Sequence, residues 1–236
     1  MDHGANLHAR DGAPLALACM KGHLELVRLL LERGANPNLA EGVPLVWAYK
    51  NGHMELVRLL LEHGANPRAN PGLLNFACKT SHMQMVRLLL EHGADVDEID
   101  GSPLEWACFN FHLEMLRVLL QHGANLHARD GAALCWACEN GHTEMVRLFL
   151  DHGANLHARD GAPLILACKK GHLELVRLLL ERGANPNPAD DLALALACEN
   201  GHVEVVRLLL ERGANPTSVV KHMFREEHAP ASRGNA

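Results

Sequence analysis

A repeat of about 30 residues runs along this chain and limits what it can fold into. The glycine of each Gly-Ala-Asn or Gly-Ala-Asp triplet lies at positions 34, 64, 93, 123, 153, 183 and 213, so the intervals are 30 residues except for one of 29. A His and an Arg recur in the same register, starting with His23 and Arg28. A unit of this size cannot bury its apolar face alone and becomes stable by stacking on its neighbours. The period therefore predicts a solenoid.

Each repeat has the pattern of two helices joined by a tight turn. In the first repeat, Pro14 suits the first turn of a helix, because its missing N–H costs nothing there, and residues 15–20 continue that helix. Over residues 24–33, apolar side chains recur at three- and four-residue spacing, and Gly34 ends this second helix. Residues 35–40 contain no strand-length pattern. We therefore expect an all-α fold of seven helix-turn-helix repeats.

The segment APLALACMKGHLELVRLLLERGANPN of the first repeat resembles the ankyrin repeat, whose unit has 33 residues and a T-P-L-H-x-A signature. The Gly-His turn, the V-R-L-L-L helix and the G-A-N end recur in the later copies with few exceptions. Three residues are missing before each following Pro-Leu, which predicts shortened finger loops. At the Thr position of the signature only Ser102 keeps a hydroxyl, so most first helices are expected to lack a side-chain cap. Short-loop arrays of this kind resemble those of large DNA viruses and of microbes that live inside host cells.

The expected organisation follows the repeat period. A partial leading repeat over 1–10 precedes seven repeats, and a short capping helix with a disordered tail follows them over 218–236. Residues 2–38 and 151–187 differ only at two positions, Ala16/Ile165 and Met20/Lys169, so the first repeat is of the internal type. Three alternatives stay open for its outer edge: it is prone to association, it is covered by residues 1–10, or it was preceded by further repeats in a longer array from which this chain is cut. The seven predicted repeats span residues 11–40, 41–70, 71–99, 100–129, 130–159, 160–189 and 190–217.

Charge and hydropathy exclude several classes of protein. The 22 Lys and Arg against 28 Asp and Glu give a net charge of −6, which disfavours a nucleic-acid binder. No apolar run approaches the length of a membrane span, because an arginine such as Arg28 or Arg58 interrupts each Leu-rich stretch. The first residues lack a secretion signal pattern. We expect a cytoplasmic protein, in a host cytoplasm if the source is a virus or an intracellular microbe.

The recurring cysteines and histidines are interpreted as structural. Stacked helices lie about 8–10 Å apart, which is too far for disulfides between neighbouring copies, so we expect buried free thiols. Cys135 and Cys138 form a C-x-x-C pair, but no second pair or histidines stand at zinc-site spacing. Most of the 17 His residues fall at repeated positions in turns and helix ends. We therefore predict no cofactor and no metal. Six cysteines share one repeat position: Cys19, Cys78, Cys108, Cys138, Cys168 and Cys198.

The aromatic residues concentrate in the middle of the chain. Four of them share one position of the first helix, where the remaining repeats have Leu, and this position is expected to belong to the core between repeats: Trp47, Phe76, Trp106 and Trp136. Phe109 and Phe111 differ, because Phe111 replaces the turn glycine and Phe109 stands where other repeats have Met, Lys or Glu. Two interpretations of this pair stay open, a binding hot spot and local repacking.

No nucleophile–base arrangement or phosphate-binding loop is present, so the sequence predicts a non-enzymatic module that binds a protein partner. The resemblance implies a binding surface on the concave side, formed by the first helices and the fingers. The expected partner-binding residues are the variable pair before each Gly-His turn, with Phe111: Met20, Lys21, Lys50, Asn51, Lys79, Thr80, Phe109, Asn110, Phe111, Glu139, Asn140, Lys169, Lys170, Glu199 and Asn200. Two alternatives stay open: a host-directed adaptor or effector, and a structural array that associates end-on through its first repeat.

Overall fold

A computed structural model describes residues 12–189 and 191–216, without side-chain detail at 99–102. Within these residues all the regular structure is helical, which confirms the all-α fold class. The chain divides into two compact units, with the boundary between Ala124 and Asn125. The expected leading segment over 1–10 and the expected capping helix over 218–236 lie outside the described residues.

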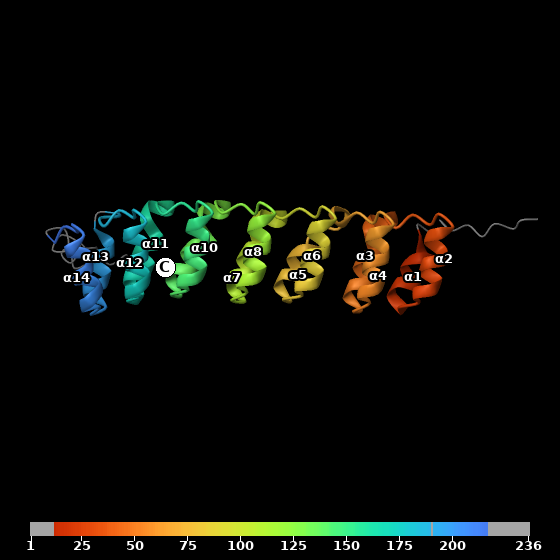
Figure 1. Ribbon diagram of the computed structural model, residues 1–236, viewed down its shortest axis with the longest axis horizontal. Coiled ribbons are helices and arrows are strands. Elements are labelled where there is room, and N and C mark those ends of the chain that lie inside the picture. Colours follow the sequence, from red (N-terminus) through yellow and green to blue (C-terminus); the bar gives the residue numbers. More distant parts are fainter. Residues whose placement is uncertain (1–11, 190, 217–236) are drawn as a thin grey trace, which may run out of the picture. The chain divides into compact units, whose positions relative to one another are not determined.

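The first unit contains four pairs of α-helices and one 3₁₀ turn. The helices of a pair pack against each other, as Figure 1 shows for α5 and α6. The elements are α1 (Ala13–Lys21), α2 (Leu24–Glu32), α3 (Leu39–Lys50), α4 (Met54–Glu62), η1 (Pro67–Ala69), α5 (Leu73–Lys79), α6 (Met83–Glu91), α7 (Glu98–Phe109) and α8 (Leu113–Gln121).

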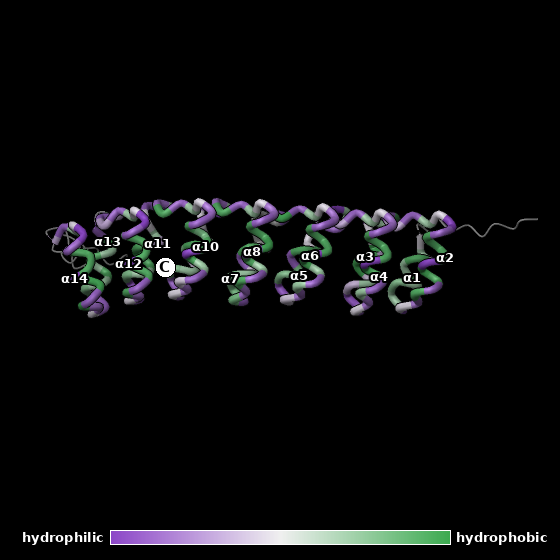
Figure 2. Tube along the Cα trace, viewed as in Figure 1, coloured by the Kyte–Doolittle hydropathy of each residue, from purple (hydrophilic) through white to green (hydrophobic). Residues whose placement is uncertain are grey.

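The second unit contains three such pairs. Its elements are η2 (Ala128–Asp130), α9 (Ala132–Glu139), α10 (Thr143–Asp151), α11 (Ala158–Lys170), α12 (Leu173–Glu181), α13 (Leu192–Glu199) and α14 (Val203–Glu211). The odd-numbered helices are the first helices of their pairs and the even-numbered ones are the second helices. In Figure 2 the apolar residues run along the helices, whereas the turns at the helix ends are mostly hydrophilic.

Burial of the second helices explains the V-R-L-L-L pattern. In α4, Val57 and Leu60 are fully buried, and Leu56 and Leu59 are also buried. The helix therefore has apolar contacts on more than one side, as a helix between two neighbours requires. Burial of a leucine side chain contributes about 1.5–3 kcal/mol, so the buried leucines of the second helices contribute substantially to stability.

The Gly-His turn depends on a left-handed backbone. Gly22 ends α1 with φ 77°, and its N–H donates to the carbonyl of Cys19. Ser81 and Phe111 occupy the same turn position in later pairs with φ 61° and 58°. A left-handed backbone at a residue other than glycine costs roughly 1–2 kcal/mol. Two turns of the first unit are therefore strained.

The last residue of the triplet organises the connector that follows each second helix from α2 to α12. In the connector after α2, the Asn36 Oδ1 accepts a hydrogen bond from the Asn38 N–H at 2.9 Å, which is an Asx turn. Equivalent bonds form at Asn66, Asp95, Asn125, Asn155 and Asn185. Asn38 also links neighbouring connectors, because its Nδ2 donates to Gly64 O at 2.8 Å and its Oδ1 accepts from Asn66 N at 2.6 Å.

The shortened fingers contain a run of left-handed residues. Before α3 straightens, Ala40, Glu41 and Gly42 have φ of 50°, 56° and 76°. Arg159, Asp160 and Gly161 repeat this run at the start of α11. The loop expected over 35–40 thus overlaps the start of α3 at Leu39, and the left-handed run at residues 40–42 puts a kink near the beginning of that helix.

Candidate protein-binding surface

The variable pairs before each Gly-His turn lie in the last turn of a first helix or directly after it. Three of the expected partner-binding residues are half-buried: Met20, Asn110 and Glu139. The others are exposed: Lys21, Lys50, Asn51, Lys79, Thr80, Phe109, Phe111, Asn140, Lys169, Lys170, Glu199 and Asn200. Accessibility at most of these positions is the first requirement for a binding surface.

Several polar members of the set satisfy helix ends. Asn51, Asn140 and Asn200 each donate from Nδ2 to a carbonyl four residues earlier, at 2.8, 2.9 and 2.8 Å. Asn110 instead reaches the neighbouring pair, where its Nδ2 lies 3.1 Å from the carbonyl oxygens of both Cys78 and Lys79. These amides stabilise the C-termini of first helices, so their recurrence has a structural reason.

The shared aromatic position is not a core position, and the sequence prediction on this point is wrong. Trp47 and Phe76 are each 40% exposed, and Trp106 and Trp136 are half-buried. Apolar character alone cannot separate a buried position from one at the edge of a packed face.

Four rings on α3, α5 and α7 form what we call the aromatic surface of the first unit: Trp47, Phe76, Trp106 and Phe109. Phe109 is 59% exposed and lies edge-on to Trp106, with ring centroids 5.9 Å apart. The ammonium group of Lys79 lies 5.0 Å from the centre of the Trp106 ring, a cation–π contact. Phe111, in the turn after α7, is 57% exposed.

Charge differs between the two units along the first helices. In the first unit, Lys50 and Lys79 are exposed at the ends of α3 and α5, two of the helices that bear the aromatic surface. In the second unit, Glu139 stands at the position of Lys50, and its Oε1 lies 3.7 Å from the Nζ of Lys170. The first unit therefore combines apolar rings with exposed cations, whereas the second presents mixed charges.

A hollow of about 390 Å³ lies beside Tyr49 in the first unit. The Tyr49 hydroxyl forms hydrogen bonds with Nδ1 of His82 at 2.7 Å and with Oγ1 of Thr80 at 3.1 Å. Burial raises the pKa of Tyr49, and the Thr80 hydrogen bond opposes that shift. The lining residues are Tyr49, Gly52, Met54, Ser81, His82, Met83, Gln84 and Met85.

Two of the turn histidines bond to the backbone of the preceding pair. Nε2 of His172 donates to the carbonyl of Glu139 at 3.0 Å, and Nε2 of His202 donates to the carbonyl of Lys169 at 3.0 Å. At the other repeated position, Nδ1 of His63, His92, His122 and His152 bonds to a helix carbonyl four residues earlier. Burial, with the neighbouring His172, lowers the pKa of His142.

The cysteine position is buried in five of its six occurrences and exposed at Cys198. Burial raises the pKa of Cys19, Cys78 and Cys168 to about 12, so these thiols are protonated and unreactive at neutral pH. Cys198 lies on α13, the first helix of the last described pair. Among the described residues, no group of three or more His, Cys, Asp or Glu side chains is placed to hold a metal ion.

Comparison with known proteins gives a family match over most of the chain. The family model described as ankyrin repeats, in three copies, matches residues 1–71, 69–130 and 134–220. No curated protein matches the sequence. In the part of the chain that the structure describes, no helix is long and apolar enough to cross a membrane.

Proposed function

Because the chain belongs to the ankyrin-repeat family, a family of generic protein–protein interaction modules, we propose that it is a non-enzymatic module that binds a protein partner through its first helices and fingers. The exposure of the aromatic surface is the observation that carries the proposal. Large exposed rings are uncommon on a surface without a partner, and Trp, Tyr and Arg dominate binding hot spots.

The chemistry of the surface selects the class of partner. Trp47, Phe76 and Phe109 offer apolar area. Lys79 contacts the Trp106 ring, and Lys50 is exposed three residues after Trp47 on α3. A segment with apolar side chains and neighbouring carboxylates would match both features, since charge complementarity steers association and fixes register. We therefore propose an acidic, apolar segment of a protein as the ligand of the first unit.

Phe111 allows binding to be separated from folding. A glycine at this turn suits φ 58° better than a phenylalanine, so Phe111→Gly is expected to keep or raise stability. Phe109→Lys changes a side chain that is 59% exposed, so it is also expected to fold. A loss of binding in the double variant Phe109→Lys/Phe111→Gly therefore cannot be ascribed to unfolding once circular dichroism matches that of the wild type.

The experiment selects displayed peptides on the wild-type chain and then measures the affinity of a recovered peptide for variants. Phe109→Lys/Phe111→Gly and Trp47→Ala are each expected to weaken binding by about 30-fold or more, the effect of losing a hot-spot residue. The matched control is Val203→Ala, which removes an apolar side chain that is 64% exposed in the second unit. Equal affinities for all four proteins would place the binding surface elsewhere and refute the proposal.

A further inference from the structure

The first helix pair exposes apolar residues that its later equivalents bury. Leu26 and Leu29 on α2 are 45% and 46% exposed. The same residues of the identical helix sequence in α12, Leu175 and Leu178, are 1% and 6% exposed. The difference lies in the neighbour, because α12 packs against α10 of the preceding pair.

Near-identity of residues 2–38 and 151–187 makes the second unit a template for what α1 and α2 can bind. The side chains by which the pair α11–α12 bonds to the preceding pair all have identical counterparts in α1–α2, and so do the two buried leucines. We call the counterparts the leading face: Lys21, His23, Leu26, Leu29 and Arg33. They correspond in order to Lys170, His172, Leu175, Leu178 and Arg182.

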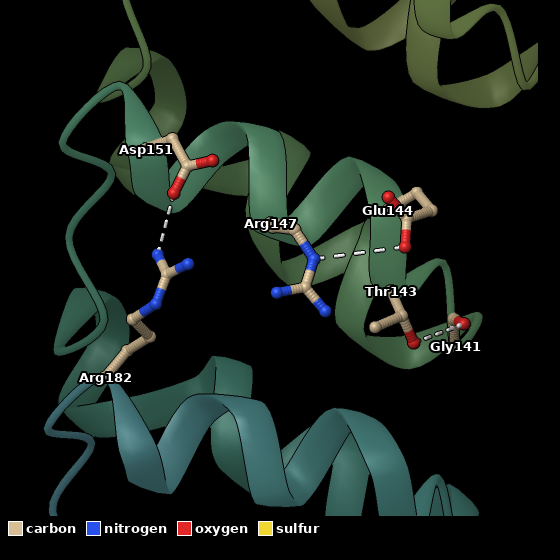
Figure 3. Close-up of polar contacts among 6 residues, drawn as sticks. All are labelled: Gly141, Thr143, Glu144, Arg147, Asp151 and Arg182. Atoms are coloured by element: carbon tan, nitrogen blue, oxygen red, sulfur yellow. Dashed lines mark hydrogen bonds and ion pairs between the residues drawn. The ribbon is translucent and has the colours of Figure 1, made fainter.

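Three polar contacts accompany the buried leucines in the template. Nη1 of Arg182 lies 2.9 Å from Oδ1 of Asp151, as Figure 3 shows. Lys170 Nζ pairs with Glu139 Oε1 at 3.7 Å, and His172 donates to the carbonyl of Glu139. A surface that complements the leading face is therefore the side of a helix pair that faces the following pair. Such a pair must have carboxylates at the positions of Glu139 and Asp151.

The last described pair of this chain has that complement. Sixty residues after Glu139 and Asp151 stand Glu199 and Glu211, on α13 and α14. Of the other residues at the Glu139 position, Met20, Lys50, Lys79, Phe109 and Lys169, none carries a carboxylate. The α13–α14 pair thus presents to a following pair the same charges as α9–α10.

The apolar part of this side is also accessible. Cys198 is exposed, whereas its equivalent Cys138 is buried, and Leu210 on α14 is 43% exposed. Val206 is half-buried, whereas its equivalent Val146 is fully buried. We call this set the trailing face: Cys198, Glu199, Val206, Leu210 and Glu211.

We propose that the leading face of one copy of the chain binds the trailing face of a second copy, in the arrangement that α11–α12 takes on α9–α10. In this contact Arg33 pairs with Glu211 of the second copy and Lys21 with its Glu199, while Leu26 and Leu29 pack beside its α14. Such a contact uses two different surfaces, so it propagates from copy to copy as an open chain or a ring.

Residues 2–10 are the competing occupant within the same chain. They have the same sequence as residues 151–159 and so include an equivalent of Asp151. They include no equivalent of Glu139 or of the rest of α10. Residues 2–10 therefore offer a carboxylate that can pair with Arg33. They offer neither a carboxylate for Lys21 nor a helix to cover Leu26 and Leu29. A test must separate this intramolecular cover from a second copy.

The test is sedimentation velocity of residues 1–236 over a concentration series, with a reducing agent present so that Cys198 cannot crosslink copies. We expect a weight-average mass that rises with concentration above the monomer's 25.8 kDa. Leu26→Glu is expected to weaken association by about 30-fold or more, as a charge in the centre of an interface does. Arg28→Glu is the control, because Arg28 is exposed on the same helix but pairs with Glu25 of its own turn.

Charge reversal identifies the partner surface. Arg33→Glu and Glu211→Arg are each expected to weaken association, and the double variant to restore it. A mixture of Leu26→Glu with Glu199→Lys/Glu211→Arg should stop at a 1:1 dimer, because each protein keeps one competent face. A constant monomer mass overturns the proposal and assigns the leading face to residues 1–10 or leaves it solvated. The pairing of leading with trailing face is overturned if the Arg33→Glu/Glu211→Arg double variant does not associate. It is also overturned if the mass of the Glu199→Lys/Glu211→Arg variant alone rises with concentration.

Discussion

At residue 49 a tyrosine fills the position that a cysteine occupies in the other repeats. The side chain is buried, with 5% of its surface exposed, and its ring lies edge-on to Phe76 with centroids 5.8 Å apart. Its hydroxyl reaches across to His82 and Thr80 of the next pair. His82 therefore bonds to a side chain, whereas His172 and His202 bond to the backbone of the preceding pair. One substitution changes how two neighbouring pairs are joined.

Tyr49→Phe tests this connection. Removal of the hydroxyl is expected to lower the free energy of unfolding by about 1 kcal/mol, the net contribution of a typical hydrogen bond. Urea unfolding followed by circular dichroism measures the loss. A double-mutant cycle with His82→Ala provides the control, since residues in contact show non-additive effects. Additive losses would show that the hydroxyl and the imidazole do not interact in solution.

At the scale of helices, Glu98 replaces a cap that the sequence does not provide locally. Gly72 precedes α5 and has no side chain to cap it, but Oε1 of Glu98 accepts a hydrogen bond from the backbone N–H of Asn75 at 2.6 Å. Burial raises the pKa of Glu98 above its usual value of 4.5, although hydrogen bonds from the backbone of Asn75, Gly72 and Leu74 oppose that shift. The residue therefore caps the first helix of the preceding pair from its own finger.

Two variants of Glu98 separate capping from charge. Glu98→Ala is expected to lower stability by about 1 kcal/mol, as the loss of a helix cap does. Glu98→Gln keeps an acceptor oxygen and is expected to retain most of the stability at neutral pH.

The sign of the pH effect follows from the raised pKa. The folded protein binds the Glu98 proton more tightly than the unfolded chain, so this stabilisation is complete below pH 4.5 and is lost as the pH rises through the folded-state pKa. Urea unfolding of the wild type and Glu98→Gln at several pH values should therefore show the wild type gaining relative to the variant as the pH falls. A gain toward higher pH would contradict the raised pKa.

The repeat period predicted the helix pairs because every pair shows the same apolar spacing and ends in the same glycines. It did not predict the Glu98 cap, because the bond joins residues 23 positions apart and only the stacking of neighbouring fingers brings them together. It also placed Trp47 and Phe76 in the core, since apolar spacing marks the packed side of a helix without giving its width. Most residues of the variable pairs are exposed, and their role in partner binding stays a prediction. The helix-capping bonds of their asparagines depend on backbone geometry, which the repeat period does not give.

At the scale of the whole molecule, the neighbouring helix pairs determine how much a residue contributes to stability. The helices α2 and α12 have the same sequence, LELVRLLLE, and their valines Val27 and Val176 are both fully buried. The leucine just before each valine differs in exposure, because Leu26 is 45% exposed and Leu175 is 1% exposed. Repeat proteins gain stability from each repeat and from each interface between neighbours. The two helices allow the interface contribution to be measured in identical local sequence.

Leu175→Ala is expected to lower the free energy of unfolding by about 2–5 kcal/mol, because it leaves a cavity between α12 and its neighbour. Leu26→Ala is expected to cost less than about 1 kcal/mol at protein concentrations too low for association, since much of its surface is already in water. Urea unfolding measures both losses, and Val27→Ala with Val176→Ala serves as the control pair, for which similar losses are expected. Similar losses for Leu26→Ala and Leu175→Ala in dilute solution would mean that the chain itself covers Leu26. If the cost of Leu26→Ala instead rises with protein concentration, the missing neighbour is a second copy.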